Sequence, residues 1–198
     1  MAQAVSEPAL KPAAGRLASI KSWGYQLQRA VPAQIAASPY DLVVIDYSRD
    51  GSEAGRFTPA EIKAMQVKPD GSRRFVLAYL SIGEAEDYRY YWQKRWVEPA
   101  PFKARPAALP RPADMPATVR IPRLVAPGWL GRENAVWSGN FLVRFWYEGW
   151  QEIIMHGSSS YLAKIQEAGF DGVYLDRVDA YYAIESDRED AARRMVDF

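Results

Sequence analysis

Three short apolar runs recur along the chain, and each of them stops at an acidic or polar residue. The runs cover residues 42–45, 75–80 and 173–175, and they contain mostly Val, Ile and Leu. Uninterrupted apolar runs of this length are typical of parallel strands that are covered on both faces. A further strand is expected over residues 18–25, so the pattern predicts four strands.

Helix signals fill the spaces between the first three predicted strands. A short helix is expected over residues 32–37. Thr58 is a good N-cap for the next helix, because Pro59 occupies the first helical position and Glu61 completes a Thr-x-x-Glu capping box. A turn is predicted at residues 68–72, where Pro, Asp, Gly and Ser follow one another.

The C-terminal part of the chain predicts two more helices. Apolar residues between positions 150 and 165 recur at helical spacing, and Gly169 suits the cap after this helix. The charged segment 186–198 predicts a last, exposed helix, in which Glu189 and Arg193 have the spacing of an ion pair.

This alternation of elements predicts the fold class. Strands separated by helical crossovers indicate repeated right-handed βα units and hence a parallel sheet. The class is therefore α/β, of the (β/α) TIM-barrel type. A complete barrel of eight units takes about 250 residues, whereas this chain has 198. Because only four or so units are predicted, we expect a partial barrel whose edge strands need a cover.

The predicted barrel part covers residues 18–198 as one domain. Residues 1–17 are small, polar and Pro-containing, which predicts a flexible tail without the apolar core of a signal peptide. Eight of the 14 prolines lie between positions 99 and 127. Pro this dense breaks helix and sheet, so a surface loop or lid is expected there, and an insertion without a role is the alternative.

Charge and composition exclude several classes of function. Lys and Arg number 25 against 24 Asp and Glu, and the formal net charge of +1 gives no field for nucleic acid or an anionic membrane. Without cysteine there is no disulfide, thiolate nucleophile or Cys-based zinc site. No apolar run approaches the roughly 20 residues of a transmembrane helix. His156, the single histidine, lies on a predicted helix and is expected to be an ordinary one.

Carboxylates follow three of the predicted strands. In a barrel, the carboxyl ends of the strands form one rim, where active sites are built. An acid at a strand end can also cap the next helix or pair with an arginine such as Arg89 or Arg177. Carboxylates without a supporting histidine or cysteine allow glycoside hydrolysis or a hard-metal site with oxygen ligands. The acids concerned are Asp46, Glu84, Glu86, Asp176 and Asp179.

The distribution of aromatic residues favours the first of these chemistries. Six of the seven tryptophans lie between Trp92 and Trp150. Aromatic rings form platforms against the apolar faces of sugars, although large aromatics are also the commonest core residues. For any single ring, both interpretations stay open.

Five motifs in order give the chain a family resemblance. They are Trp23-Gly-Tyr-Gln-Leu27, Asp41-Leu-Val-Val-Ile-Asp-Tyr-Ser48, Ala78-Tyr-Leu-Ser-Ile-Gly-Glu-Ala-Glu-Asp-Tyr-Arg89, Trp137-Ser-Gly-Asn140 and Gly169-Phe-Asp-Gly-Val-Tyr-Leu-Asp176. Together they resemble glycoside hydrolase family 114, the endo-α-1,4-polygalactosaminidase-like TIM barrels. The resemblance runs from about Trp23 to the C-terminus.

The resemblance implies a retaining glycosidase that acts on galactosamine-containing polysaccharide without a cofactor or metal. It makes Asp176 the expected nucleophile, and the general acid is expected on a later strand, beyond residue 198. Within the chain, Glu84 and Glu86 are the remaining catalytic candidates. The candidates for substrate binding are Trp23, Tyr25, Asp46, Tyr79, Arg89, Trp137 and Asp179. An extracellular or periplasmic location is also implied.

Two alternatives remain at this stage. One is a non-catalytic sugar-binding or truncated pseudoenzyme fragment, and the other is an oxygen-ligand metal hydrolase built on the same acids. For the glycosidase and for the sugar-binding fragment, the expected partner is a polysaccharide or oligosaccharide.

Overall fold

Four strands form the main sheet, in the order β1-β2-β3-β7. The register places Trp23 beside Leu42, and Leu42 beside Phe75, with parallel pairing. The α/β class with a four-stranded parallel sheet, as expected for a partial barrel, is therefore confirmed. The strands are β1 (Trp23–Gln26), β2 (Leu42–Ile45), β3 (Phe75–Ser81) and β7 (Gly172–Asp176).

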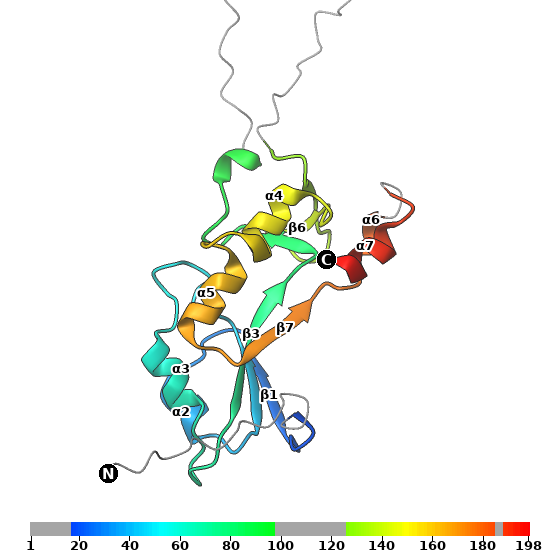
Figure 1. Cartoon of the computed structure of the whole chain (residues 1–198). Coiled ribbons are helices and arrows are strands. Elements are labelled where there is room, and N and C mark those ends of the chain that lie inside the picture. Colours follow the sequence, from blue (N-terminus) through cyan, green and yellow to red (C-terminus); the bar gives the residue numbers. More distant parts are fainter. Residues whose placement is uncertain (1–16, 98–125, 185–187) are drawn as a thin grey trace, which may run out of the picture. The chain divides into compact units, whose positions relative to one another are not determined.

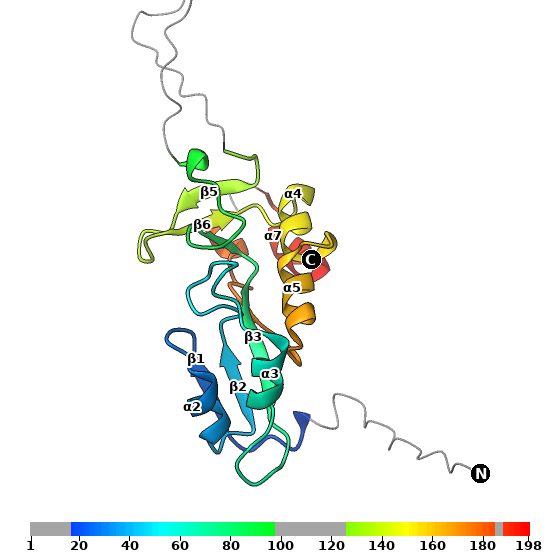
Figure 2. The same cartoon turned by 90° about the vertical axis from the view of Figure 1, so that its left-hand side faces the viewer.

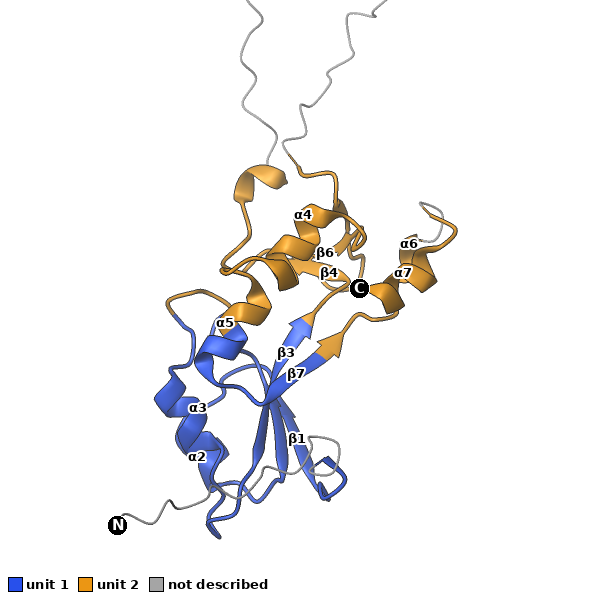
Figure 3. Ribbon diagram, viewed as in Figure 1, with its two compact units in different colours: residues 1–50, 55–80, 165–174 blue, residues 51–54, 81–164, 175–198 orange. Residues whose placement is uncertain are grey.

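The computed structural model describes residues 17–97, 126–184 and 188–198 (Figures 1 and 2). Most of the predicted proline-rich insertion at 99–127 and nearly all of the predicted tail lie outside these residues. The chain divides into two compact units (Figure 3). Unit 1 comprises residues 1–50, 55–80 and 165–174, and unit 2 comprises residues 51–54, 81–164 and 175–198. The prediction of one domain over residues 18–198 stays a prediction.

In unit 1, two helices cover one face of the sheet (Figures 1 and 2). They are α2 (Pro32–Ala37) and α3 (Pro59–Met65), and both begin with the predicted proline. The capping box of α3 is present, because the Thr58 side chain and the Glu61 side chain each accept a backbone N–H of the other residue. The apolar core between sheet and helices includes Ile35, Val43, Ile45, Ile62, Met65 and Val76.

Arg74 holds the C-terminal ends of both helices of unit 1. Its guanidinium is buried and donates to the carbonyl oxygens of Tyr40 (2.9 Å), Met65 (2.7 Å) and Ser38. The last carbonyl groups of a helix have no partner within the helix, and a cation favours the negative end of the helix dipole. No local pattern predicts this arrangement, because the carbonyl groups come from separate segments of the chain.

Unit 2 contains a second sheet that the apolar pattern did not predict. Its order is β4-β6-β5, and both pairings are antiparallel. The strands are β4 (Glu84–Glu86), β5 (Leu130–Glu133) and β6 (Asn140–Val143). The helical segments are η1 (Lys94–Trp96), α4 (Glu148–Gln151), the π-helix η2 (Glu152–His156), α6 (Tyr181–Ile184) and α7 (Ala191–Asp197). Helix α5 (Tyr161–Ala168) contributes residues to both units.

Several tryptophans of unit 2 are core residues. Trp96, Trp129 and Trp150 are buried, and the Trp129 ring centre lies 5.1 Å from that of Trp96 and 5.0 Å from that of Trp150. For these three rings the packing alternative is confirmed. Trp137 differs from them because it is 66% exposed.

Two predicted boundaries were wrong. The first strand begins at Trp23 rather than at residue 18, because the backbone N–H groups of Lys21 and Ser22 donate to the Asp41 carboxylate and are lost to strand pairing. The last helix begins at Ala191, so the predicted partner Glu189 lies before it. Ion pairs in the described part of this segment join Asp190 to Arg188 and to Arg194, and Arg193 to Asp197. Gly169, with a φ of +85°, does follow α5 as predicted.

Replacing Arg74 is expected to destabilise unit 1 strongly. In Arg74→Met the carbonyl groups at the two helix ends lose their buried donors, which predicts a loss of about 3 kcal/mol in the free energy of unfolding. The neighbouring Arg73→Met is the matched control, because Arg73 forms an exposed ion pair with Asp171 and its loss costs about 1 kcal/mol or less. Urea unfolding measures both, and equal losses contradict the capping role.

Asp41 is expected to make unit 1 sensitive to acid. Hydrogen bonds from the Lys68 ammonium and the Lys21 backbone hold the pKa of Asp41 well below its ordinary value of 3.8. A depressed pKa stabilises the folded state above the ordinary value, and this contribution is lost as the pH falls below it. Asp41→Asn should therefore be less stable than the parent at about pH 7 and lose this difference towards about pH 2. Urea unfolding at both values tests this, and a constant difference contradicts it.

Candidate functional site

The C-terminal ends of β3 and β7 meet in unit 2. The backbone N–H of Ile82 donates to the carbonyl oxygen of Asp176 at 3.1 Å. A Cβ on Gly83 would lie 2.3 Å from the carbonyl oxygen of Arg177 and 2.4 Å from the Cβ of Ala180. Only glycine permits this approach, so residue 83 fixes the turn that follows Asp176.

Arg177 links this turn to β4. Its φ of +59° is in the left-handed region, which is uncommon for a residue with a side chain. The Nε atom lies 3.0 Å from Oε1 of Glu84 as an ion pair without the geometry of a hydrogen bond, and Nη1 lies 3.3 Å from Oδ1 of Asp179. The structure therefore brings three of the predicted residues together, since Asp176 precedes Arg177 in the chain.

Glu84 and Glu86, the acids predicted just past the strand of residues 75–80, form the ends of a separate strand, β4. Because side chains alternate along a strand, the two carboxylates share one face. Both residues are only 4% exposed. Oε1 of Glu84 accepts a hydrogen bond of 2.8 Å from Nδ2 of Asn134, in addition to its ion pair with Arg177.

Glu86 belongs to a buried ion pair with Arg89. The Nε atom of Arg89 donates to Oε2 of Glu86 at 2.6 Å, and the hydroxyl of Tyr88 donates to Oε1 at 2.5 Å. The Arg89 guanidinium also lies over the rings of Tyr88 and Tyr161, at 4.8 and 5.3 Å from their centres. Burial, followed by the Glu86 charge, raises the pKa of Tyr91 well above its ordinary value, so its hydroxyl stays protonated.

Arginine pairing was the alternative that the sequence left open for strand-end acids, and both glutamates show it. A carboxylate engaged by buried donors suits a positioning role, because its oxygen atoms are already occupied by neighbours. A catalytic role for Glu84 or Glu86 stays a prediction.

The other predicted residues are divided between the units. Asp46 follows β2 in unit 1, is 6% exposed and accepts the backbone N–H of Ser48 at 3.0 Å. Tyr79 is buried in β3, whereas Trp23 and Tyr25 of β1 are about half exposed. The Tyr25 ring meets that of Tyr174 edge to face at 5.7 Å. Unit 2 holds Glu84, Glu86, Arg89, Trp137, Asp176 and Asp179.

Sequence reasoning missed two residues of the unit 2 site. Asn134 carries no motif signal, and only its place shortly before the Trp137 motif could have drawn attention to it. Arg177 was considered only as an ion-pair partner, although it directly follows the expected nucleophile. Both make their contacts with Glu84, which is distant in sequence from each of them.

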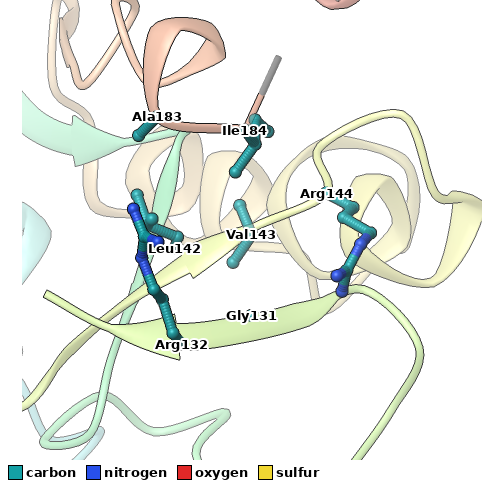
Figure 4. Close-up of a pocket in the computed structure, with 7 residues that line it drawn as sticks. All are labelled: Gly131, Arg132, Leu142, Val143, Arg144, Ala183 and Ile184. Carbon is teal, nitrogen blue, oxygen red and sulfur yellow. The ribbon is translucent and has the colours of Figure 1, made fainter. Parts of the chain in front are cut away.

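A small pocket of about 170 Å³ lies elsewhere in unit 2 (Figure 4). Its lining combines apolar residues of β6 and α6 with two arginines and includes none of the predicted acids. The lining residues are Gly131, Arg132, Leu142, Val143, Arg144, Ala183 and Ile184.

The described residues contain no group of three or more His, Cys, Asp or Glu side chains placed to hold a metal ion. None of their helices is both long and apolar enough to cross a membrane.

The fold is shared with solved glycoside hydrolase domains. The chain superposes on the glycoside hydrolase domain of PelA from Pseudomonas aeruginosa with a TM-score of 0.52 and 17% identity. It superposes on Aspergillus fumigatus Ega3, in a complex with galactosamine, with a TM-score of 0.50 and 18% identity. In both cases 89% of this chain is covered, against 52% and 50% of the solved chains. The fold thus corresponds to about half of the barrel fold of these solved chains.

A match to a protein-family model lies in the C-terminal part of the chain. Residues 120–198 match the model of glycoside hydrolase family GH114. The resemblance to glycoside hydrolase family 114 that the sequence motifs indicate is confirmed by this match over residues 120–198.

Sequence relatives come from distant organisms. An uncharacterized protein of Thermotoga maritima is 39% identical over 184 residues, which are 89% of this chain and 46% of the relative. An uncharacterized protein of Methanocaldococcus jannaschii is 39% identical, and the match covers 89% of this chain and 42% of the relative. An uncharacterized protein of Deinococcus radiodurans is 34% identical, and the match covers 89% of this chain and 46% of the relative. The chain spans about half the length of the curated relatives that it matches.

Gly83→Ala is expected to disturb the turn after Asp176. The new methyl group collides with the Arg177 carbonyl and the Ala180 side chain, so the predicted loss in the free energy of unfolding is about 2 kcal/mol. Gly157→Ala is the control, because the nearest atom to its Cβ lies at an ordinary 3.4 Å. Thermal unfolding of both variants measures the difference in their stability. A Gly83→Ala variant as stable as Gly157→Ala would show that the turn accommodates the methyl group without loss of stability.

Proposed function

We propose that this chain supplies the nucleophile side of a retaining glycoside hydrolase that cleaves galactosamine-containing polysaccharide. The observation that carries the proposal is the position of Asp176 at the C-terminal end of a barrel strand. In barrel enzymes, catalytic residues come from such strand ends. The backbone bond from Ile82 and the tight contact at Gly83 give this position a fixed backbone, as a nucleophile requires.

In this mechanism Asp176 attacks the anomeric carbon of the sugar. An acid protonates the leaving oxygen, and water then hydrolyses the covalent glycosyl-enzyme intermediate. The two carboxyl groups of a retaining enzyme stand about 5–5.5 Å apart. Because Glu84 and Glu86 are held in buried ion pairs, we assign the acid to neither of them.

The proposed substrate class rests on charge and on the comparisons. Amino-sugars are cationic when they are not acetylated, and acids such as Asp176 and Asp179 provide the complementary charge. The solved complex of Ega3 with galactosamine supports the same class of sugar. An enzyme for such a polysaccharide is expected outside the cytoplasm.

A second candidate is a sugar-binding chain without catalysis. It is favoured by the buried pairing of Glu84 and Glu86 with arginines. The two candidates share a substrate and differ in turnover.

Replacing the proposed nucleophile separates them. Asp176→Asn keeps the shape of the side chain and removes its nucleophilic charge, so hydrolysis of α-1,4-linked galactosamine polymer should fall by about 10³-fold or more. Reducing-end release measures the rate. The control is Asp197→Asn, which removes an exposed carboxylate of α7 and should leave the rate unchanged.

Each other outcome has a definite meaning. Equal turnover by the parent and Asp176→Asn removes the nucleophile assignment. Binding of the oligosaccharide without turnover by the parent supports the sugar-binding candidate, and calorimetric titration detects it.

A further inference from the structure

An ordered loop of unit 2 holds a tryptophan in solvent. The loop joins β5 to β6, and Trp137 is 66% exposed in it. Oδ1 of Asn134 accepts the backbone N–H groups of Val136 (2.9 Å) and Trp137 (3.3 Å). Oε1 of Glu133 accepts the backbone N–H of Gly139 at 2.8 Å. These hydrogen bonds within the loop hold its backbone in place, so the exposed indole of Trp137 offers a rigid apolar surface.

The same loop is tied to the turn of the proposed nucleophile. Nδ2 of Asn134 donates to Oε1 of Glu84 at 2.8 Å, and the same oxygen pairs with Nε of Arg177 at 3.0 Å. Arg177 directly follows Asp176. One buried carboxylate oxygen therefore stands between the Asp176 turn and the Trp137 loop.

We propose that Glu84 is a positioning residue that couples the Asp176 turn to the Trp137 loop, and that Trp137 is the stacking platform of a sugar subsite. The sugar part rests on the proposed function, whereas the coupling part does not. Indole faces pack against the apolar faces of sugar rings, and a platform that is already ordered binds with a smaller entropic cost.

The chemistry of the contacts favours this role for Glu84. One oxygen of the Glu84 carboxylate accepts the amide hydrogen bond of Asn134 and also forms the ion pair with Arg177. Both neighbouring groups are thereby fixed with respect to Glu84. Glu84 is only 4% exposed, so moving either partner would leave a buried charge without compensation. Such a rearrangement has a high free-energy cost in surroundings of low polarity. The loop and the turn thus share one rigid support, as precise binding sites require.

The coupling is tested without any ligand. The chain has seven tryptophans, so labelling with 5-fluorotryptophan gives seven fluorine NMR signals, and Trp137→Phe identifies the signal of Trp137. Asn134→Asp keeps the Oδ1 acceptor inside the loop and removes the Nδ2 donor to Glu84, and Glu84→Gln removes the charge that holds Arg177. In both variants the Trp137 signal should shift or broaden, whereas the signals of the buried Trp129 and Trp150 stay in place and report an intact fold.

Asp197→Asn is the matched control and should leave all seven signals unchanged. A Trp137 signal that both Asn134→Asp and Glu84→Gln leave unmoved overturns the coupling. One variant removes the contact of Glu84 with the loop and the other weakens its contact with Arg177. If one variant fails to fold, the other still tests the coupling.

The subsite is tested by adding an α-1,4-linked galactosamine oligosaccharide. The Trp137 signal should shift on titration, and Trp137→Ala should weaken binding about tenfold. Glu84→Gln should also weaken binding, while the signals of the buried tryptophans stay in place. If Glu84 served the fold alone, its replacement would not weaken binding in a protein whose fold is intact.

The outcomes keep the two proposals apart. A titration that leaves the Trp137 signal in place overturns the platform, whatever the hydrolysis assay shows. A shift of that signal without hydrolysis supports the platform and counts against the proposed catalytic function alone.

Discussion

The backbone at Ile82 and Gly83 is the constraint on which unit 2 depends. Its polar groups are buried and must find partners. The N–H of Ile82 donates to Asp176, its carbonyl oxygen accepts from the Trp150 indole at 2.9 Å, and the Gly83 carbonyl accepts from the N–H of Val143 at 3.2 Å. Two residues thus satisfy their hydrogen bonds with β7, with the aromatic core and with β6. The position of Asp176 follows from this requirement, and so does the start of β4.

Buried charge is the second organising feature, and it serves different ends in the two units. In unit 1 the guanidinium of Arg74 is surrounded by carbonyl oxygens and closes two helix ends. In unit 2 Glu84 and Glu86 are paired with Arg177 and Arg89. A charge away from water has to be compensated at short range, which makes such groups good supports for neighbouring segments. The proposed nucleophile directly precedes Arg177 in the chain, and the loop of the exposed Trp137 is bonded to Glu84 through Asn134.

Much of the fold was predictable because its signals are local. The apolar run 75–80 and the capping box of Thr58 and Glu61 depend on residues that are close in sequence, and the structure has both features. The second sheet was not predictable in this way. β4 contains two glutamates, and Gly131 interrupts β5, so neither strand has the apolar pattern of a buried strand. They form because each pairs with β6.

The sequence by itself determined the parallel α/β class, the place of Asp176 at a strand end and the family resemblance. These properties follow from residue order, since a strand end is marked where an apolar run meets a carboxylate. Only the tertiary structure decided which carboxylates are engaged and by which residues. Glu84 meets Asn134 and Arg177 from positions about 50 and 93 residues away in the chain. Such contacts depend on how separate strands are placed, and no local pattern records them.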